Sequence, residues 1–242
     1  MEPKRPQRTS TERKRFRKAI SRVKLESYRR SRTDTEKDLI STYIWNVSLC
    51  ESFYPVLHNF EIALRNNFNS AISQSFSESW LVDTCSSRGD LLFPDEVNSV
   101  MEAAQSLKRK GEILSNTHLM SELSLGFWIS LLYSKYESHN RLYPKLFRDK
   151  EFFPYIPRRT RTRNEICSAL VPVKKLRNAI FHYNPVWKNG KKLVEEHSNI
   201  LEIIKWVSPI LADLTEKQSR FLHVYQQGPT ISLPILEGLE LD

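Results

Sequence analysis

Two residues in the second half of the chain, Arg177 and His182, have side chains that phosphodiester cleavage requires. An arginine stays charged and can bind phosphate oxygens in a bidentate fashion, and a histidine can accept or donate a proton near neutral pH. On a helix Asn178 shares a face with His182 and can hydrogen-bond its imidazole. The trio predicts RNA cleavage in which His182 acts on the 2′-hydroxyl or the leaving 5′-oxygen. Arg177 would stabilise the charge that develops on the phosphate.

The same residues have a plainer interpretation. An arginine and a histidine at such a spacing occur by chance in many chains of 242 residues. Arg177 would then form a surface ion pair, and His182 would be a polar residue in the last turn of a helix, where exposed carbonyls favour a protonated ring. The spacing alone leaves both interpretations open.

A second candidate feature is Glu61, a carboxylate inside an apolar stripe. On the helix expected over 54–76 it falls between Leu57 and Leu64. Burial of an unpaired carboxylate is costly, and Arg65 lies one turn further on, where it can pair with Glu61. The pair is either a plain intrahelical ion pair or part of a functional cleft in which it orients a neighbour.

The net charge of +9 is concentrated in two basic zones. Residues 1–32 hold thirteen Lys or Arg against three Glu, and residues 141–177 hold eleven against three acidic residues. Such zones attract a phosphate backbone. The first zone is either an RNA contact or a solvated tail. In the second zone, the residues expected to contact RNA are Arg158, Arg159, Arg161, Arg163, Lys174 and Lys175.

The composition predicts an all-α fold, because the chain has only six glycines and is rich in strong helix formers. Apolar periodicity and capping residues predict helices from Thr33 or Asp34 to Cys50 and over 54–76, 95–110, 119–136, 158–184 and 194–222. Pro172 and Pro209 should bend or interrupt the last two helices, and 78–94 should be a loop. The expected organisation is a basic, disordered tail (1–22), one helical domain (23–225) and a C-terminal tail (226–242).

Cofactor, metal and membrane functions are disfavoured. The three cysteines and six histidines lack metal-ligand spacing, so we expect no metal, no cofactor and reduced thiols. No stretch is apolar over the length of a membrane helix, and no apolar core follows the basic N-terminus as it would in a secretory signal. These features predict a cytoplasmic protein without a membrane partner.

Four stretches in series resemble the Abi-like (AbiD/AbiF) family of bacterial abortive-infection proteins, with order and spacing that agree over residues 25–215. The last of them also resembles the R-x4–6-H motif of HEPN-domain ribonucleases. The stretches are Tyr43-Ile-Trp45-Asn46, Asn59-Phe-Glu61-Ile-Ala-Leu-Arg65-Asn66, Leu123-Ser-Leu-Gly126-Phe127-Trp128, and Leu176-Arg177-Asn178 with His182-Tyr183-Asn184-Pro185.

The resemblance implies a HEPN-like helical bundle and a homodimer in which two Arg/His motifs meet in one cleft. It implies a metal-independent endoribonuclease that acts on RNA and shuts down an infected cell. Arg177 and His182 would be catalytic, Asn178 would support them, and Glu61 and Arg65 match a recurrent family pattern. A toxin of this kind needs control, so an inhibitory antitoxin or RNA is an expected partner.

Other features leave alternatives open. Pro172 interrupts the helix that leads to the motif, and the basic tail before residue 23 lies outside the resemblance. The runner-up function is a non-catalytic helical module that binds RNA or a partner, with Arg177 and His182 only contacting phosphate. A metal-dependent nuclease is the least favoured, because the sequence has no carboxylate cluster.

Overall fold

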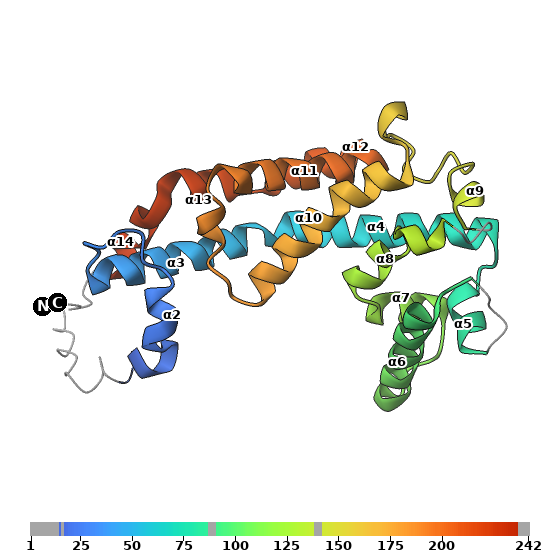
Figure 1. Ribbon diagram of the computed structural model, residues 1–242, viewed down its shortest axis with the longest axis horizontal. Coiled ribbons are helices and arrows are strands. Elements are labelled where there is room, and N and C mark those ends of the chain that lie inside the picture. The colour runs from blue at the N-terminus through green and yellow to red at the C-terminus, as the bar shows by residue number, and fades with distance from the viewer. Residues whose placement is uncertain (1–14, 16, 87–90, 138–141, 237–242) are drawn as a thin grey trace, which may run out of the picture. The chain divides into compact units, whose positions relative to one another are not determined.

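The computed structural model describes residues 15, 17–86, 91–137 and 142–236 (Figure 1). Over these ranges the chain is helical and has no β-strand, which confirms the predicted all-α class. Most of the predicted disordered tail, 1–14 and 16, lies outside the described residues. Residues 17–20 are helical, and Ile20 packs against a small apolar cluster. The described end of the predicted tail therefore belongs to the fold.

The chain forms two compact units, whereas the sequence indicated one domain over 23–225. Three helices cross the division: α4 (Tyr54–Ser75), after its first residue, α10 (Arg163–Phe181) and α11 (Lys191–Val207). Because the division falls inside regular helices, no linker composition marks it in the sequence. Unit 1 consists of Met1–Tyr54, Ala179–Val194 and Ser219–Asp242, and unit 2 consists of Pro55–Asn178 and Glu195–Gln218.

Unit 1 is organised around α3 (Glu36–Ser52). A capping box begins this helix: the Thr35 hydroxyl accepts from the Asp38 N–H at 3.3 Å, and the Asp38 carboxylate accepts from the Thr35 N–H at 2.9 Å. Thr35 is thus the cap, rather than the predicted Thr33 or Asp34. The other elements of unit 1 are α2 (Arg22–Glu26), η3 (Val186–Asn189), α13 (Phe221–Gln227), η4 (Gly228–Ser232) and α14 (Leu233–Leu236).

The segment predicted as a C-terminal tail, 226–242, is helical in its described part. Residues 228–236 form η4 and α14, and η4 packs against α3. Leu236 is buried together with Leu25 and Ile40. The sequence of this segment shows no helical periodicity. Its fold depends on long-range contacts to α3, which a short window of sequence does not contain.

Unit 2 is organised around α4 (Tyr54–Ser75), whose stripe from Leu57 to Ile72 is buried as predicted. The Asn59 amide donates to the Thr215 hydroxyl at 2.9 Å, which ties α4 to α12 (Pro209–Gln218) alongside it (Figure 1). The remaining elements are α5 (Trp80–Cys85), α6 (Pro94–Lys110), α7 (Asn116–Glu122), α8 (Leu125–Ser130), η1 (Ser134–Tyr136), α9 (Leu142–Leu146) and η2 (Arg158–Thr160).

Local capping accounts for the helices that differ from prediction. The helix expected over 119–136 is divided into α7, α8 and η1, because the Ser124 hydroxyl accepts from the Phe127 N–H and starts a new helix. The short α5 lies in the predicted loop 78–94. Pro209 ends α11 and begins α12, whereas α10 continues through Pro172. None of the helices among the described residues combines the length and the apolar character needed to cross a membrane.

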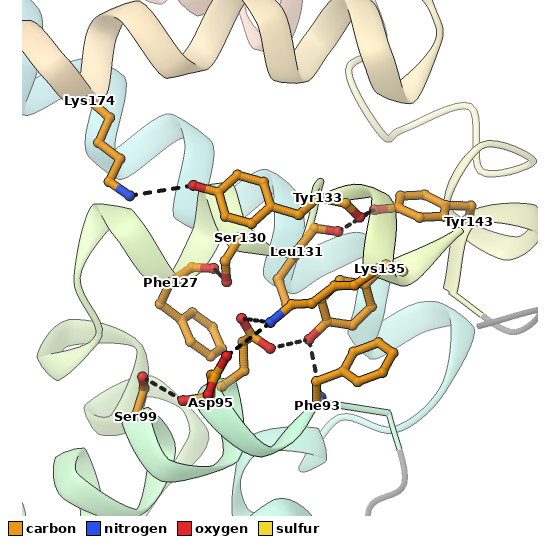
Figure 2. Close-up of polar contacts among 12 residues, drawn as sticks. Phe93, Asp95, Ser99, Phe127, Ser130, Leu131, Tyr133, Lys135, Tyr143 and Lys174 are labelled. Atoms are coloured by element: carbon orange, nitrogen blue, oxygen red, sulfur yellow. Dashed lines mark hydrogen bonds and ion pairs between the residues drawn. The ribbon is translucent and has the colours of Figure 1, made fainter. Parts of the chain in front are cut away.

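A buried carboxylate ties α6 to η1. Glu96 is 3% exposed and accepts from the Lys135 ammonium at 2.8 Å and from the Tyr136 hydroxyl at 2.9 Å. Figure 2 shows this network, with Lys135 also lying near Asp95 and the Phe93 ring. Burial raises the pKa of Glu96. The hydrogen bonds from Lys135, Ser130 and Tyr136 together lower the pKa by more than burial raises it, so it lies below its usual value. The network therefore holds Glu96 ionised inside the fold.

Burial of His197 on α11 predicts a pH-dependent loss of stability. Desolvation lowers the pKa of His197 from 6.5 to about 4, so the folded protein holds the ring neutral while the unfolded chain protonates it. The free energy of unfolding should fall by ~2–3 kcal/mol as the pH drops from 7 to 4 on account of this residue. Chemical denaturation at several pH values measures the slope.

Comparison of the parent with His197→Leu isolates this contribution from that of the carboxylates, since the variant should lose the extra slope between pH 7 and 4. His223→Gln is the matched control, because His223 is exposed on α13 and its replacement should leave the slope unchanged. A parent and a His197→Leu variant with the same slope would contradict the prediction.

Candidate functional site

Arg177 is oriented by a carboxylate within unit 2. Its Nε donates to Glu61 Oε1 at 3.1 Å, and Arg65 Nη2 donates to Glu61 Oε2 at 3.0 Å. The intrahelical pair anticipated on α4 is therefore present, and the same carboxylate also binds a residue of α10. Glu61 thus joins two helices and two arginines.

The exposure of these three side chains decides what the cluster can do. Glu61 is 15% exposed, Arg65 23% and Arg177 32%. Glu61 lies inside and compensates positive charge, while Arg177 keeps a third of its side chain in contact with solvent. An arginine whose direction is fixed through Nε and which remains accessible is suited to bind a phosphate.

His182 lies just beyond the end of α10, in unit 1. The helix ends at Phe181, and the exposed His182 is the next residue. Tyr183 then adopts the left-handed conformation with φ 59°, and the Asn184 N–H donates back to the Ala179 carbonyl at 2.9 Å. This is the Schellman arrangement that ends many helices, with a tyrosine at the position where glycine is usual.

Asn46 holds the chain that follows His182. This residue of α3 is 2% exposed, and its amide donates to the Asn184 carbonyl and accepts from the Trp187 N–H, both at 3.3 Å. The neighbouring Trp45 donates from Nε1 to the Val224 carbonyl at 3.0 Å. The Trp-Asn pair of α3 therefore fixes two other segments of unit 1.

A third anchor comes from the segment around α2. The Lys24 ammonium and the Tyr28 hydroxyl both donate to the Tyr183 carbonyl, the second at 3.4 Å. Tyr28 is 1% exposed, so its ring belongs to the core of unit 1. The residue after His182 is thus held from two directions, through its carbonyl and through Asn184.

Three of the six basic residues expected to contact RNA have structural partners. Arg161 donates to the Asp149 carbonyl at 2.6 Å. Arg163 donates to the Leu132 carbonyl at 3.0 Å and to the Glu137 carboxylate at 2.6 Å. Both side chains hold loops of unit 2 in place, which the sequence alone did not indicate.

The other basic residues are three exposed side chains and the half-buried Lys174. Arg158, Arg159 and Lys175 are exposed, and their contact with RNA stays a prediction. Lys174 extends from α10 to the Tyr133 hydroxyl at 3.5 Å (Figure 2).

Three of the four stretches that carry the family resemblance contact residues in the fourth stretch or next to it. A Cβ built on Gly126 would lie 3.5 Å from Lys174 Cε, which places the third stretch next to α10 within unit 2. Glu61 of the second stretch binds Arg177 in unit 2, and Asn46 of the first binds the chain after His182 in unit 1. Spacing along the sequence gave no sign of these contacts.

The structure shows contacts of residues that the sequence did not single out, whereas the role of Asn178 stays a prediction. Lys24 and Tyr28 were missed by sequence reasoning, because their partner Tyr183 lies more than 150 positions away in the chain. Asn46 belongs to a recognised stretch, but its hydrogen bonds required the structure. Asn178 is half-buried on α10, and its supporting role stays a prediction.

Among the described residues, no group of three or more His, Cys, Asp or Glu side chains is placed to hold a metal ion. Comparison of the chain with models of protein families, with curated proteins and with solved structures gave no match.

The Glu61 cluster predicts a loss of stability in Glu61→Gln. The neutral amide cannot compensate two arginines, so the free energy of unfolding should fall by about 1–2 kcal/mol. Urea denaturation followed by circular dichroism measures it. Asp213→Asn is the matched control, because it breaks an exposed ion pair with Lys217 on α12 and should cost under about 0.5 kcal/mol. Equal effects of the two substitutions would show that the Glu61 contacts contribute little.

The Asn46 contacts predict a looser chain after His182 in Asn46→Ala. The substitution leaves a carbonyl and an N–H of the 184–187 turn without their partner, which should cost about 2–3 kcal/mol. Amide hydrogen exchange over residues 183–187 should accelerate by at least about tenfold. Asn199→Ala removes one amide-to-carbonyl bond in unit 2, to Ala169, and should leave exchange at 183–187 unchanged. Unaltered exchange in Asn46→Ala would refute the anchoring role.

Proposed function

We propose that the protein is a metal-independent endoribonuclease in which Arg177 and His182 carry the chemistry. The observation that carries this proposal is the set of anchors on the segment that contains both residues. In unit 2 a carboxylate directs Arg177, and in unit 1 three side chains fix the turn that follows His182. Residues held in this way are preorganised, which is what catalysis by positioning requires.

In the proposed reaction, His182 accepts the proton of a ribose 2′-hydroxyl, and the 2′-oxygen attacks the adjacent phosphorus. The bond from phosphorus to the 5′-oxygen breaks, and a protonated imidazole supplies the proton to that leaving oxygen. Arg177 stabilises the extra negative charge on the phosphate in the transition state. The products are a 2′,3′-cyclic phosphate and a 5′-hydroxyl end.

Glu61 orients the guanidinium group of Arg177 and also compensates part of its positive charge. A carboxylate that binds Nε leaves the charge on the delocalised guanidinium, so the group can still attract a phosphate. Because Arg65 also pairs with Glu61, the cluster keeps net positive charge. This arrangement favours an anionic ligand at Arg177.

The biological setting follows from the family resemblance. We propose a role in bacterial phage defence, a HEPN-like homodimer with a composite site, cytoplasmic localisation and control by an antitoxin or RNA. Light scattering at working concentrations tests the dimer, and a monomer would count against a composite site.

His182→Ala tests the chemistry. The parent should cut single-stranded RNA in the presence of EDTA and leave cyclic phosphate ends. The variant should cut at least about 100-fold more slowly, because it lacks the proton-transfer group. Gel analysis of labelled RNA measures the rate, and end-group analysis of the fragments identifies the phosphate. His223→Ala is the matched control, because His223 is exposed on α13, and it should retain the parent rate.

Binding measurements separate cleavage from simple recognition. His182→Ala should keep the RNA affinity and the circular dichroism spectrum of the parent, so that a lost rate reflects chemistry. A His182→Ala variant that cuts as fast as the parent would refute the catalytic assignment. A parent that binds RNA without cutting it would favour the non-catalytic module, which the exposed Arg158, Arg159 and Lys175 also fit.

A further inference from the structure

We propose that Tyr183 is a stacking platform for one base of single-stranded RNA, beside the nucleotide on which His182 acts. This inference rests on the proposed function for the position of the reacting bond, and on the structure of unit 1 for the platform itself. It gives the substrate class of the site as single-stranded RNA.

Tyr183 has a strained backbone conformation. Its φ of 59° lies in the left-handed region, where a side chain other than glycine carries a steric penalty. The position is the one after a helix C-cap, where glycine is the usual residue. A large aromatic residue is therefore retained where the backbone alone would favour glycine.

The ring of Tyr183 contributes little to the core. Tyr183 is 76% exposed, so its burial offsets little of the backbone penalty. By contrast, Tyr28, which binds the Tyr183 carbonyl, is 1% exposed and packs inside unit 1. The exposed ring of Tyr183 is accessible to a ligand.

The backbone that carries the Tyr183 ring is fixed by hydrogen bonds. Lys24 and Tyr28 donate to the Tyr183 carbonyl, and Asn46 binds the carbonyl of the next residue, Asn184. An aromatic residue with only two side-chain torsions on a fixed backbone loses little freedom when a base stacks on it. The turn is thus preorganised to present the ring.

The surrounding charge favours a nucleic acid over an apolar protein partner. The segment 179–194 contains Lys188, Lys191 and Lys192, all exposed, and has no acidic residue. On the other side of His182, Phe181 is 50% exposed. Exposed aromatic rings close to lysines in the chain suit the binding of single strands, because every base can stack and every phosphate can pair.

A platform of this kind should distinguish single strands from duplexes. Bases in a duplex are already stacked on their neighbours and cannot also lie flat against Tyr183, whereas bases of a single strand can. The structure offers a precise test, because glycine at position 183 removes the ring and suits the backbone.

The experiment measures RNA binding by the full chain with His182→Ala, so that cleavage does not interfere. The probe is a 12-nucleotide single-stranded RNA with one 2-aminopurine, whose fluorescence changes when the base stacks. Adding Tyr183→Gly should weaken binding by about 5- to 150-fold and abolish the stacking signal. Its melting temperature should equal or exceed that of the background protein, because glycine relieves the left-handed strain.

Two further variants identify the interaction. Tyr183→Phe should restore both affinity and signal, since it keeps the ring. Tyr155→Ala is the matched control, because Tyr155 is an exposed tyrosine of unit 2 (60%) that the platform does not use, and it should bind as the background does. The dependence of affinity on salt should keep its slope in Tyr183→Gly, because stacking releases no counterions, and should become shallower in Lys188→Ala.

The outcomes separate the platform from the nuclease. Unchanged affinity in Tyr183→Gly overturns the platform, even if the parent cuts RNA. An equal loss in Tyr155→Ala overturns the assignment to Tyr183, and so does equally tight binding of a duplex of the same sequence. A parent that never cuts RNA, combined with a Tyr183→Gly variant that binds it weakly, refutes the proposed reaction and supports the platform.

Discussion

Backbone groups at the end of a helix need partners, and the end of α10 shows how far this requirement reaches. The carbonyls there are satisfied partly by the turn itself, through the Asn184 N–H on the Ala179 carbonyl. The turn also exposes two further carbonyls. Lys24 and Tyr28 donate to the carbonyl of Tyr183, and Asn46 donates to that of Asn184. Residues distant in sequence are thereby committed to one short segment of unit 1, and His182 is part of that segment.

Charge compensation sets a parallel constraint in unit 2. Glu61 lies within the apolar stripe of α4, and it is stable there because Arg65 and Arg177 both donate to it. Helix packing brings the partner from α10, so the electrostatic and the hydrophobic requirements are met by the same pair of helices. The buried Glu96 shows the same logic with a different outcome, since Lys135 and Tyr136 satisfy it within a structural network.

Sequence reasoning reached the all-α class, the buried stripe of α4 and the pairing of Glu61 with Arg65, because each depends on residues within a few helical turns. It failed where long-range contacts decide. Residues 228–236, for example, fold onto α3 without helical periodicity. The Ser124 cap was also missed, although it is a local contact, because it lies inside an apolar run. Arg161 and Arg163, which the sequence suggested as RNA contacts, also bind backbone carbonyls, and their contact with RNA stays a prediction. The binding of Glu61 to Arg177 and of Asn46 to the turn spans more than a hundred positions, which no local pattern records.

The shared carboxylate of Glu61 has an evolutionary consequence. Each of its two oxygens serves a different arginine, so a substitution at position 61 leaves two charges uncompensated at once. A single substitution of Arg65 or Arg177 should cost less stability, because the Glu61 carboxylate keeps one partner. In related sequences, loss of the acid should therefore accompany changes at both arginine positions, a three-way covariation in which position 61 is the last to vary.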